Sequence, residues 1–251
     1  MPYPLLNTTS TQANNILHPG LFLDRFAEYK EDQRNPWQFN QEAQSAHIDK
    51  AIAKSAALNQ AGVLTDWQAF LEALPEPKRQ WKQTLIAPLA LHLSRPDALE
   101  NGSLCLHPIH GFAYIPGPKG LMRAYLKAWE GNAPEAERLF GGTKKAGILT
   151  ILEAWPTAWP TLKKDIVNPH HKDYFTHRGV GYAAGPWESP VPSYFLTVAP
   201  GAIFRFAIVA RTGATEADLD QGKRILQTAL QELGVGAKTA AGYGYFGAPL
   251  L

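Results

Sequence analysis

Near its end the chain reads Leu233-Gly234-Val235-Gly236-Ala237-Lys238-Thr239-Ala240-Ala241-Gly242-Tyr243-Gly244-Tyr245. Four glycines within eleven residues allow left-handed backbone conformations and close approach of a partner. Lys238 and Thr239 add a cation and a hydroxyl group. This composition indicates an anion-binding loop, although a tight helix-to-strand turn without a ligand would have the same composition.

The residues before the loop predict a helix over 215–232. Thr215 and Asp218 have the spacing of a capping box, and Gly234 has the place of a helix C-cap. The leucines that recur at helical spacing between them are Leu219, Leu226, Leu230 and Leu233. After the loop, the aromatic run from Tyr243 to Phe246 predicts a short closing strand.

The loop does not fit the common nucleotide-binding motifs. A P-loop needs Gly-Lys-Ser/Thr at the start of a helix, but Ala237 precedes Lys238 and the predicted helix lies before the loop. A dinucleotide-binding fingerprint needs a glycine at the position of Thr239. Both of these nucleotide-binding classes are therefore excluded.

A second basic helix start lies in the middle of the chain. Pro118 has the position favoured at the start of a helix, which we expect over 118–130. Lys119 and Arg123 are one turn apart at this start, where free amide groups also favour anions. These residues form a second candidate phosphate site.

The order of predicted elements favours an α+β fold. The expected elements after residue 82 are a strand over 85–93, the helix over 118–130, a strand over 148–152, a hairpin, the helix over 215–232 and the closing strand. The hairpin pairs Tyr194–Val198 with Ile203–Ala210 through Pro200-Gly201. This approximates the ferredoxin-like (RRM-like) βαββαβ order with insertions.

The first 82 residues have a different character. Helical patterns run over 21–34, 41–60 and 63–74. We therefore divide the chain into a mostly helical N-terminal region (1–82) and a ferredoxin-like domain (83–251). The N-terminal region is either an accessory layer on the domain or a surface that docks partners.

Several short motifs occur in order between His107 and Phe246. They are Tyr114-Ile-Pro-Gly-Pro-Lys-Gly-Leu-Met-Arg123, Leu139-Phe-Gly-Gly142 followed by the strand Gly147–Leu152, Asp165-Ile-Val-Asn-Pro-His170 with Tyr174, Ser193–Val198, Phe204–Ile208 and the glycine-rich loop. Together they resemble, in the same order, the motifs of the RAMP superfamily, the RNA-binding subunits of CRISPR systems. The segments 165–174, 193–198 and 204–208 are similar to the sixth-subunit family of the type III-B (Cmr) effector complexes. The first 80 residues are outside this resemblance.

The resemblance implies a non-catalytic subunit that holds the 3′ part of the crRNA near the end of the effector filament. Its implied partners are crRNA, target RNA, the repeated backbone subunit and a capping subunit, without a membrane, a metal or another cofactor. The residues that we expect to contact RNA are Lys119, Arg123, Gly234, Gly236, Lys238, Thr239, Tyr243, His170 and Lys172. Cations and aromatic side chains of this kind suit single-stranded RNA.

Two other function classes stay open. RAMP proteins that process CRISPR transcripts use a histidine against a 2′-hydroxyl group, and His110, His170 or His171 beside Lys119 or Lys172 would fit that endoribonuclease chemistry. An assembly subunit that contacts only protein is the other class. A metal site that combines His107 and His110, or His170 and His171, with Asp165 or Asp173 is conceivable, but neither histidine pair lies on a predicted helix that would converge its rings.

Composition places further limits on the chain. The net charge is only +2, but residues 101–251 hold 15 basic against 11 acidic residues, so the half with the glycine loops is the basic half. Cys105 is the only cysteine, which excludes an intrachain disulfide and a cysteine zinc site. No apolar run reaches the length of a membrane span, and the first residues lack the pattern of a secretion signal. We therefore expect a soluble, cytoplasmic protein.

Overall fold

The computed structural model describes residues 16–25, 29–30, 38–39, 41–59, 61–91, 106–168 and 192–247. Its helices are α2 (Pro19–Arg25), α3 (Gln41–Leu58), α4 (Ala61–Ala73), α5 (Lys119–Ala124) with its π-helical continuation η2 (Tyr125–Trp129), α6 (Ala133–Phe140), α8 (Glu216–Glu232) and the 3-10 turn η3 (Thr239–Ala241). Its strands are β1 (Tyr29–Lys30), β2 (Gln38–Phe39), β3 (Lys78–Leu85), β4 (Leu89–Ala90), β5 (Leu149–Ile151), β6 (Trp155–Pro156), β7 (Leu162–Val167), β8 (Ser193–Val198), β9 (Ile203–Ala210) and β10 (Phe246–Gly247). The fold is α+β, as the sequence predicts.

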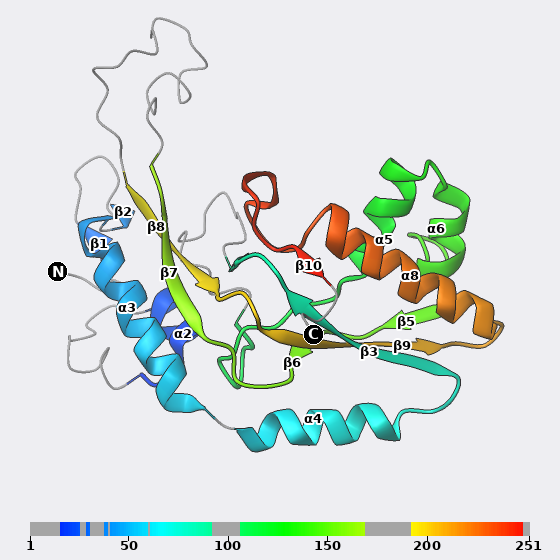
Figure 1. Cartoon of the computed structure of the whole chain (residues 1–251), viewed down its shortest axis with the longest axis horizontal. Helices are drawn as coiled ribbons and strands as arrows, with labels where there is room; N and C mark the ends of the chain where they lie inside the picture. Colours follow the sequence, from blue (N-terminus) through cyan, green and yellow to red (C-terminus); the bar gives the residue numbers. More distant parts are fainter. Residues whose placement is uncertain are drawn as a thin grey trace, which may run out of the picture.

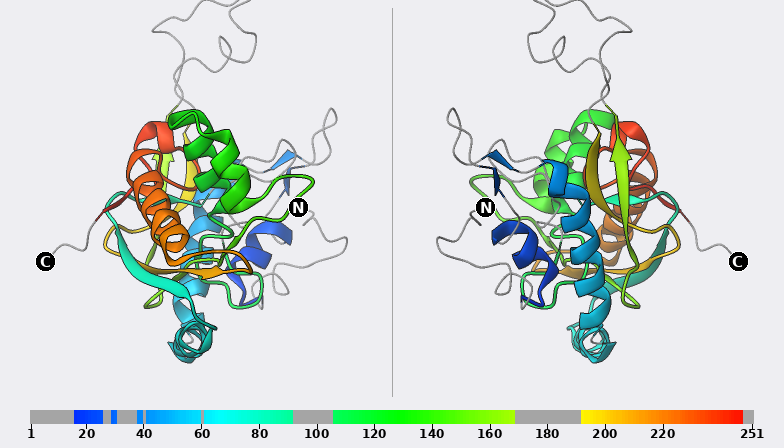
Figure 2. Two further views of the ribbon diagram at one scale, coloured as in Figure 1. Left: turned by 90° about the vertical axis from the view of Figure 1, so that its right-hand side faces the viewer. Right: turned by 90° about the vertical axis from the view of Figure 1, so that its left-hand side faces the viewer.

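The main sheet has the strand order β10-β3-β9-β5, with β6 also paired to β9. All of these pairs are antiparallel. Helices α5, α6 and α8 lie over one side of this sheet, and α4 lies on the other side (Figures 1 and 2). The helices that follow β3 and β9 therefore cover the same face.

Aromatic side chains of the main sheet pack beneath α8. The rings of Trp81 and Phe206 stack with their centroids 5.5 Å apart, and the edge of Phe246 contacts Phe204. Leu226 and Leu230 of α8 are fully buried in the same cluster. Burial of this apolar surface is the main stabilising contribution to the core.

A second sheet, in the order β4-β8-β7, is covered on one side by α3 (Figure 1). Lys164 of β7 binds the carboxylate of Asp49 at 2.6 Å and the hydroxyl of Ser45 at 2.8 Å. The amide of Tyr194 donates to the side chain of Gln44. This part of the N-terminal region is therefore a layer on the second sheet.

The predicted hairpin between Tyr194–Val198 and Ile203–Ala210 is wrong. Both strands form, but β8 pairs with β4 and β7, whereas β9 pairs with β3, β5 and β6. The chain crosses from one sheet to the other between them, because Gly201 donates to the carbonyl of Leu85 and Leu85 donates to the carbonyl of Ala202. The turn is thus bound to β3 instead of closing a hairpin.

The strand predicted over 85–93 is also displaced. β3 starts at Lys78 and ends at Leu85, and only Leu89–Ala90 continues as β4. The charged start of β3 is stabilised by α8, because Arg79 binds Glu216 and Asp220. The predicted domain boundary at 82/83 consequently falls inside a strand of the main sheet.

Two further elements differ from their predictions. The first helix ends at Arg25, and Tyr29–Lys30 already belongs to a strand, so a helix over 21–34 is wrong. The closing strand is Phe246–Gly247, because the residues before it complete the glycine-rich loop.

The helix predicted over 215–232 is confirmed with its termini. Thr215 and Asp218 form the expected capping box, and Gly234 follows the C-cap residue in a left-handed conformation with φ of 68°. None of the helices in the described part of the chain combines the length and the apolar character needed to cross a bilayer.

Candidate nucleic-acid interface

The glycine-rich loop runs from the end of α8 to β10 and contacts both sheets. Val235 donates to the carbonyl of Gly244 at 2.9 Å, which closes the loop at its base. Ala237 donates to Ala90 at 3.2 Å, and Gly244 donates to Pro88 at 2.8 Å. The loop is therefore fixed to β4 and to the connection that precedes it.

Close packing explains two of the glycines directly. A Cβ atom at Gly244 would lie 1.8 Å from the carbonyl oxygen of Val235, and one at Gly236 would lie 2.8 Å from that of Ala90. Both residues also have positive φ angles. The loop needs glycine at these two positions because two parts of the backbone come close together there. Contact of the Gly234 and Gly236 amides with a phosphate stays a prediction.

Lys238 has an unusual backbone conformation, and its side chain reaches β8 of the second sheet. Its φ angle of 60° is left-handed, and it is the only such residue other than glycine among the described residues. Its Nζ atom lies 4.8 Å from the ring centroid of Phe195 in β8. Since Phe195 is buried, this cation–π contact holds the ammonium group at the edge of the loop.

Tyr243 connects the loop to β7. Its hydroxyl donates to Asp165 Oδ2 at 2.7 Å, and its ring meets Phe195 edge-on with centroids 5.5 Å apart. Asp165 and Phe195 are opposite each other in the pairing of β7 with β8. Burial, and then the bond to Asp165, raise the pKa of Tyr243 to about 12, so the phenol is a neutral donor at physiological pH.

The role of Asp165 differs from the one that the sequence suggests. Its candidate role was that of a metal ligand, whereas the structure makes it the acceptor for Tyr243. Thr239 is half-buried in the same loop, and its carbonyl accepts a bond from the Tyr245 hydroxyl at 3.2 Å.

Lys119 and Arg123 lie on α5, which packs against α6 and α8. Both side chains are half-buried, and neither makes an ion pair with any other residue that the structure describes. Tyr125, just after α5, lies near Glu232 at the end of α8, whose carboxylate adds to the effect of burial in raising the pKa of Tyr125. The helix that carries Lys119 and Arg123 therefore ends near the C-terminal end of α8, where the glycine-rich loop begins.

The remaining histidine and lysine candidates divide into two groups. His170 and Lys172, together with His171, lie outside the described residues. His107 is buried against His110, and its Nδ1 atom accepts bonds from the amides of Ile109 and His110. Burial lowers the pKa of His107 to about 4, with smaller contributions from His110 and His18. His107 is therefore a packed, neutral side chain at physiological pH.

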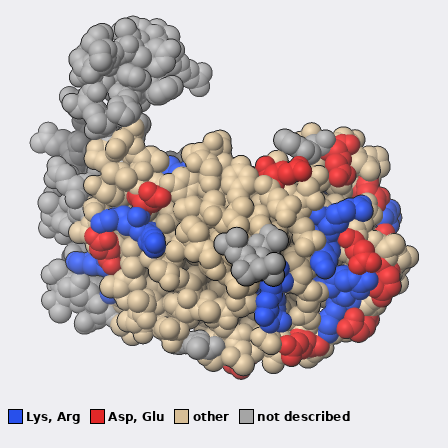
Figure 3. Space-filling model, in the orientation of Figure 1, with Lys and Arg blue, Asp and Glu red and all other residues tan. Residues whose placement is uncertain are grey.

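Charge is unevenly spread over the face drawn in Figure 3. On the face in Figure 3, basic and acidic side chains are interspersed near the two ends, and the described residues visible between them form no continuous basic stripe. Within the residues that the structure describes, no three His, Cys, Asp or Glu side chains are grouped to hold a metal ion. The basic groups visible on this face are therefore separate from one another and do not form one continuous basic surface.

Comparison with known proteins identifies the family. Residues 101–247 match the model of the RAMP superfamily. CRISPR system Cmr subunit Cmr6 of Pyrococcus furiosus is 36% identical over 117 residues, which cover 44% of this chain and 33% of that protein. CRISPR system CMR subunit Cmr6 of Saccharolobus solfataricus is 26% identical over 152 residues, covering 58% and 48%. The chain therefore spans between a third and a half of the length of these curated relatives.

A solved structure shows the same fold at low identity. A chain in the cryo-EM structure of the Type III-B Cmr-beta bound to cognate target RNA superposes with a TM-score of 0.54 and 18% identity, covering 83% of this chain and 76% of that one. The family model covers more than half of this chain and includes α5, every strand from β5 to β10 and the glycine-rich loop, whereas β3 and β4 lie before the matched residues. The chain belongs to the RAMP superfamily.

Proposed function

We propose that this chain is a non-catalytic RNA-binding subunit of a type III-B CRISPR (Cmr) ribonucleoprotein effector complex. It holds the 3′ part of the crRNA near the end of the filament and acts in antiviral defence. Two relatives named Cmr6 support the assignment to this complex. The observation that carries RNA binding is the fixed glycine-rich loop, which holds Lys238 over Phe195 and joins both sheets.

The arrangement of the main sheet supports a ferredoxin-like core for this function. Counted along the chain, β3, β5, β9 and β10 are its first, second, third and fourth strands, and their spatial order is fourth, first, third, second. Helix α5 follows the first strand and α8 follows the third. This is the strand and helix order of the split βαβ fold.

RNA would be bound mainly through its backbone. Lys119, Arg123 and Lys238 offer cations to phosphates. Tyr243 and Lys238 both contact Phe195. Such contacts are independent of base identity, which leaves sequence recognition to pairing between guide and target. The proposed protein partners are the repeated backbone subunit and a capping subunit, and cutting of target RNA belongs to the backbone subunit.

Binding and cleavage can be followed in one experiment. The purified chain is incubated, with and without EDTA, with labelled guide RNA that carries a repeat-derived 5′ tag, across a salt series. We expect intact RNA to be bound and the affinity to fall with salt, as counterion release requires. Discrete cleavage that is lost in His170→Ala or His171→Ala would instead identify a processing endoribonuclease. Absence of RNA binding would favour a subunit that contacts only protein.

A further inference from the structure

A pocket of about 500 Å³ lies beside α6, away from the glycine-rich loop. It is lined by Pro134, Glu137 and Arg138 of the helix and by the segment 142–145, Gly-Thr-Lys-Lys. No residue of this pocket was a candidate for RNA binding in the sequence. Its volume is within the range of small-ligand sites, and its lining is mostly polar.

The loop that carries the two lysines is held in one shape. Gly141 has a φ angle of 79°, and a Cβ atom at Gly147 would lie 2.4 Å from the carbonyl oxygen of Leu139. The amide of Gly142 donates to the carbonyl of Lys145 at 2.9 Å. Thr143 and Lys144 are therefore at the tip of a closed turn, and little entropy remains to be lost when a ligand binds there.

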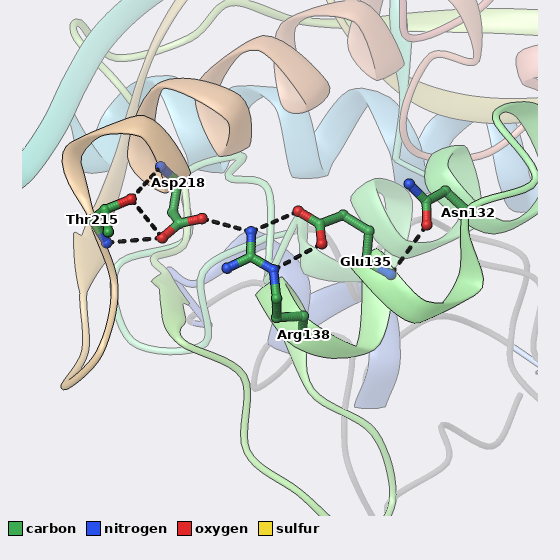
Figure 4. Close-up of polar contacts among 5 residues, drawn as sticks. All are labelled: Asn132, Glu135, Arg138, Thr215 and Asp218. Carbon is green, nitrogen blue, oxygen red and sulfur yellow. Dashed lines mark hydrogen bonds and ion pairs between the residues drawn. The ribbon is translucent and has the colours of Figure 1, made fainter.

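The other charges at the pocket are already paired. Arg138 lies between Glu135 and Asp218, with its Nη2 atom 2.6 Å from a carboxylate oxygen of each (Figure 4). Glu137 faces Lys127 of η2, with Nζ and Oε1 4.0 Å apart. Lys144 and Lys145 are exposed and make no ion pair with any described residue. Among the charged side chains that line the pocket, those without an ion pair to a described residue are therefore the two lysines.

The pocket also lies at the end of a row of cations. Lys119 and Arg123 are four residues apart on α5, which places them on one side of that helix, about 6 Å apart along its axis. Lys127 follows in η2, the π-helical continuation of α5. Lys127 reaches the pocket through Glu137, and α5 packs against α6. The row therefore leads from the predicted phosphate site at Lys119 to the lysines of the loop.

We propose that Thr143, Lys144 and Lys145 form a phosphate subsite for the RNA backbone, reached along the row Lys119, Arg123 and Lys127. This inference rests on the proposed RNA-binding function. It extends the proposed path of the RNA backbone over α5 to α6. Thr143 offers a hydroxyl donor, the lysines offer cations and Gly142 permits close approach of the backbone. The pocket lining has no aromatic ring for base stacking, so the subsite binds phosphate and does not select bases.

The test compares two double variants of the full chain for binding of labelled single-stranded guide RNA. Lys144→Ala with Lys145→Ala removes the subsite cations, and Lys50→Ala with Lys82→Ala removes two exposed lysines elsewhere. We expect the first variant to lose about tenfold or more in affinity at low salt, and its salt slope to fall by about 1.4, at about 0.7 per lost phosphate contact. The control keeps its affinity within about twofold, and Lys144→Arg with Lys145→Arg retains binding.

The outcomes separate this subsite from the function on which it rests. Equal losses in the subsite and control variants would show a general effect of charge and would overturn the subsite. Unchanged binding in Lys144→Ala with Lys145→Ala would overturn the subsite alone, because the wild-type chain would still bind RNA. Failure of the wild-type chain to bind RNA would overturn both proposals. Thermal melts of all variants establish that they are folded.

Discussion

The hydroxyl of Tyr243 and the carboxylate of Asp165 are 2.7 Å apart, although 78 residues separate them in the sequence. This bond attaches the glycine-rich loop to the edge strand of the second sheet. Because Phe195 contacts both Tyr243 and Lys238, the same strand pair positions the phenol and the ammonium group. The Tyr243–Asp165 bond therefore sets where the loop presents its cation.

Replacing Tyr243 with phenylalanine should destabilise the protein. The change leaves the half-buried carboxylate of Asp165 without its donor, which costs about 1–3 kcal/mol, or about 2–12 °C in melting temperature for a chain of this size. Thermal denaturation followed by circular dichroism measures the loss. Tyr245→Phe is the matched control, because Tyr245 donates only to a backbone carbonyl at 3.2 Å. Adding Asp165→Asn to Tyr243→Phe should recover part of the loss, and a larger loss in the double variant would contradict this account.

Removing the two predicted phosphate-binding lysines should weaken RNA binding. We expect Lys238→Ala with Lys119→Ala to reduce affinity by a similar factor for RNAs of different sequence, because phosphate contacts carry no base information. Electrophoretic mobility shifts on two unrelated guide RNAs at low salt measure this. Unchanged affinity in the double variant, or a loss confined to one RNA, would contradict the assignment of Lys119 and Lys238 as phosphate-binding residues.

Two glycines of the loop should differ sharply in their tolerance of alanine. Gly242 and Gly244 both have positive φ angles, but a Cβ atom at Gly242 meets nothing within 4 Å, whereas one at Gly244 lies 1.8 Å from a carbonyl oxygen. Gly242→Ala should therefore cost only the conformational strain of about 1 kcal/mol, and Gly244→Ala should cost several times more. Urea denaturation of both variants gives the comparison, and equal costs would show that the loop relaxes around the new side chain.

The Asp218 carboxylate should make stability depend on pH in the acid range. The bond from Arg138, followed by bonds from Thr215, lowers the pKa of Asp218 to about 2. Because this pKa is lower in the folded state than in the unfolded chain, the ionised carboxylate stabilises the folded protein. This contribution to the free energy of unfolding is on the order of 2 kcal/mol and is complete above the ordinary pKa of aspartate. It is lost as the pH falls from about 4 to about 2. Denaturation at a series of pH values should show this dependence and its loss in Asp218→Asn. Asp66→Asn is the control, because Asp66 is exposed and makes no ion pair with any described residue. An unchanged acid dependence in Asp218→Asn would exclude Asp218 as its source.

Local signals predicted the elements that depend on neighbouring residues. The capping box and the terminal glycine defined α8, and the helical patterns defined α3 and α4. The start of β3 was not recognisable, because the charged residues Lys78, Arg79 and Lys82 are not typical of a strand in a sheet core. Arg79 is neutralised by two carboxylates of α8, which is distant in the sequence. Strands β8 and β9 were predicted almost to the residue, but their partners were not, because the choice of pairing depends on the other strands.

The same limit applied to the candidate site. Lys238 and Tyr243 were recognisable from their place among the glycines, whereas the role of Asp165 depends on a contact between distant strands. Lys144 and Lys145 lie between the two parts of a motif that carries the family resemblance, Leu139–Gly142 and Gly147–Leu152. Their proposed role depends on the packing of α6 near η2. Sequence pattern indicates which chemistry is present, and packing decides which groups share a surface.

The attachment of the glycine-rich loop to Pro88, Ala90 and Asp165 has a kinetic consequence. A ligand that reaches Lys238 meets a surface that is complete before the encounter, so association needs no slow closing step. Its rate should follow diffusion and electrostatic attraction, and selectivity should appear in how fast a poorly fitting ligand leaves.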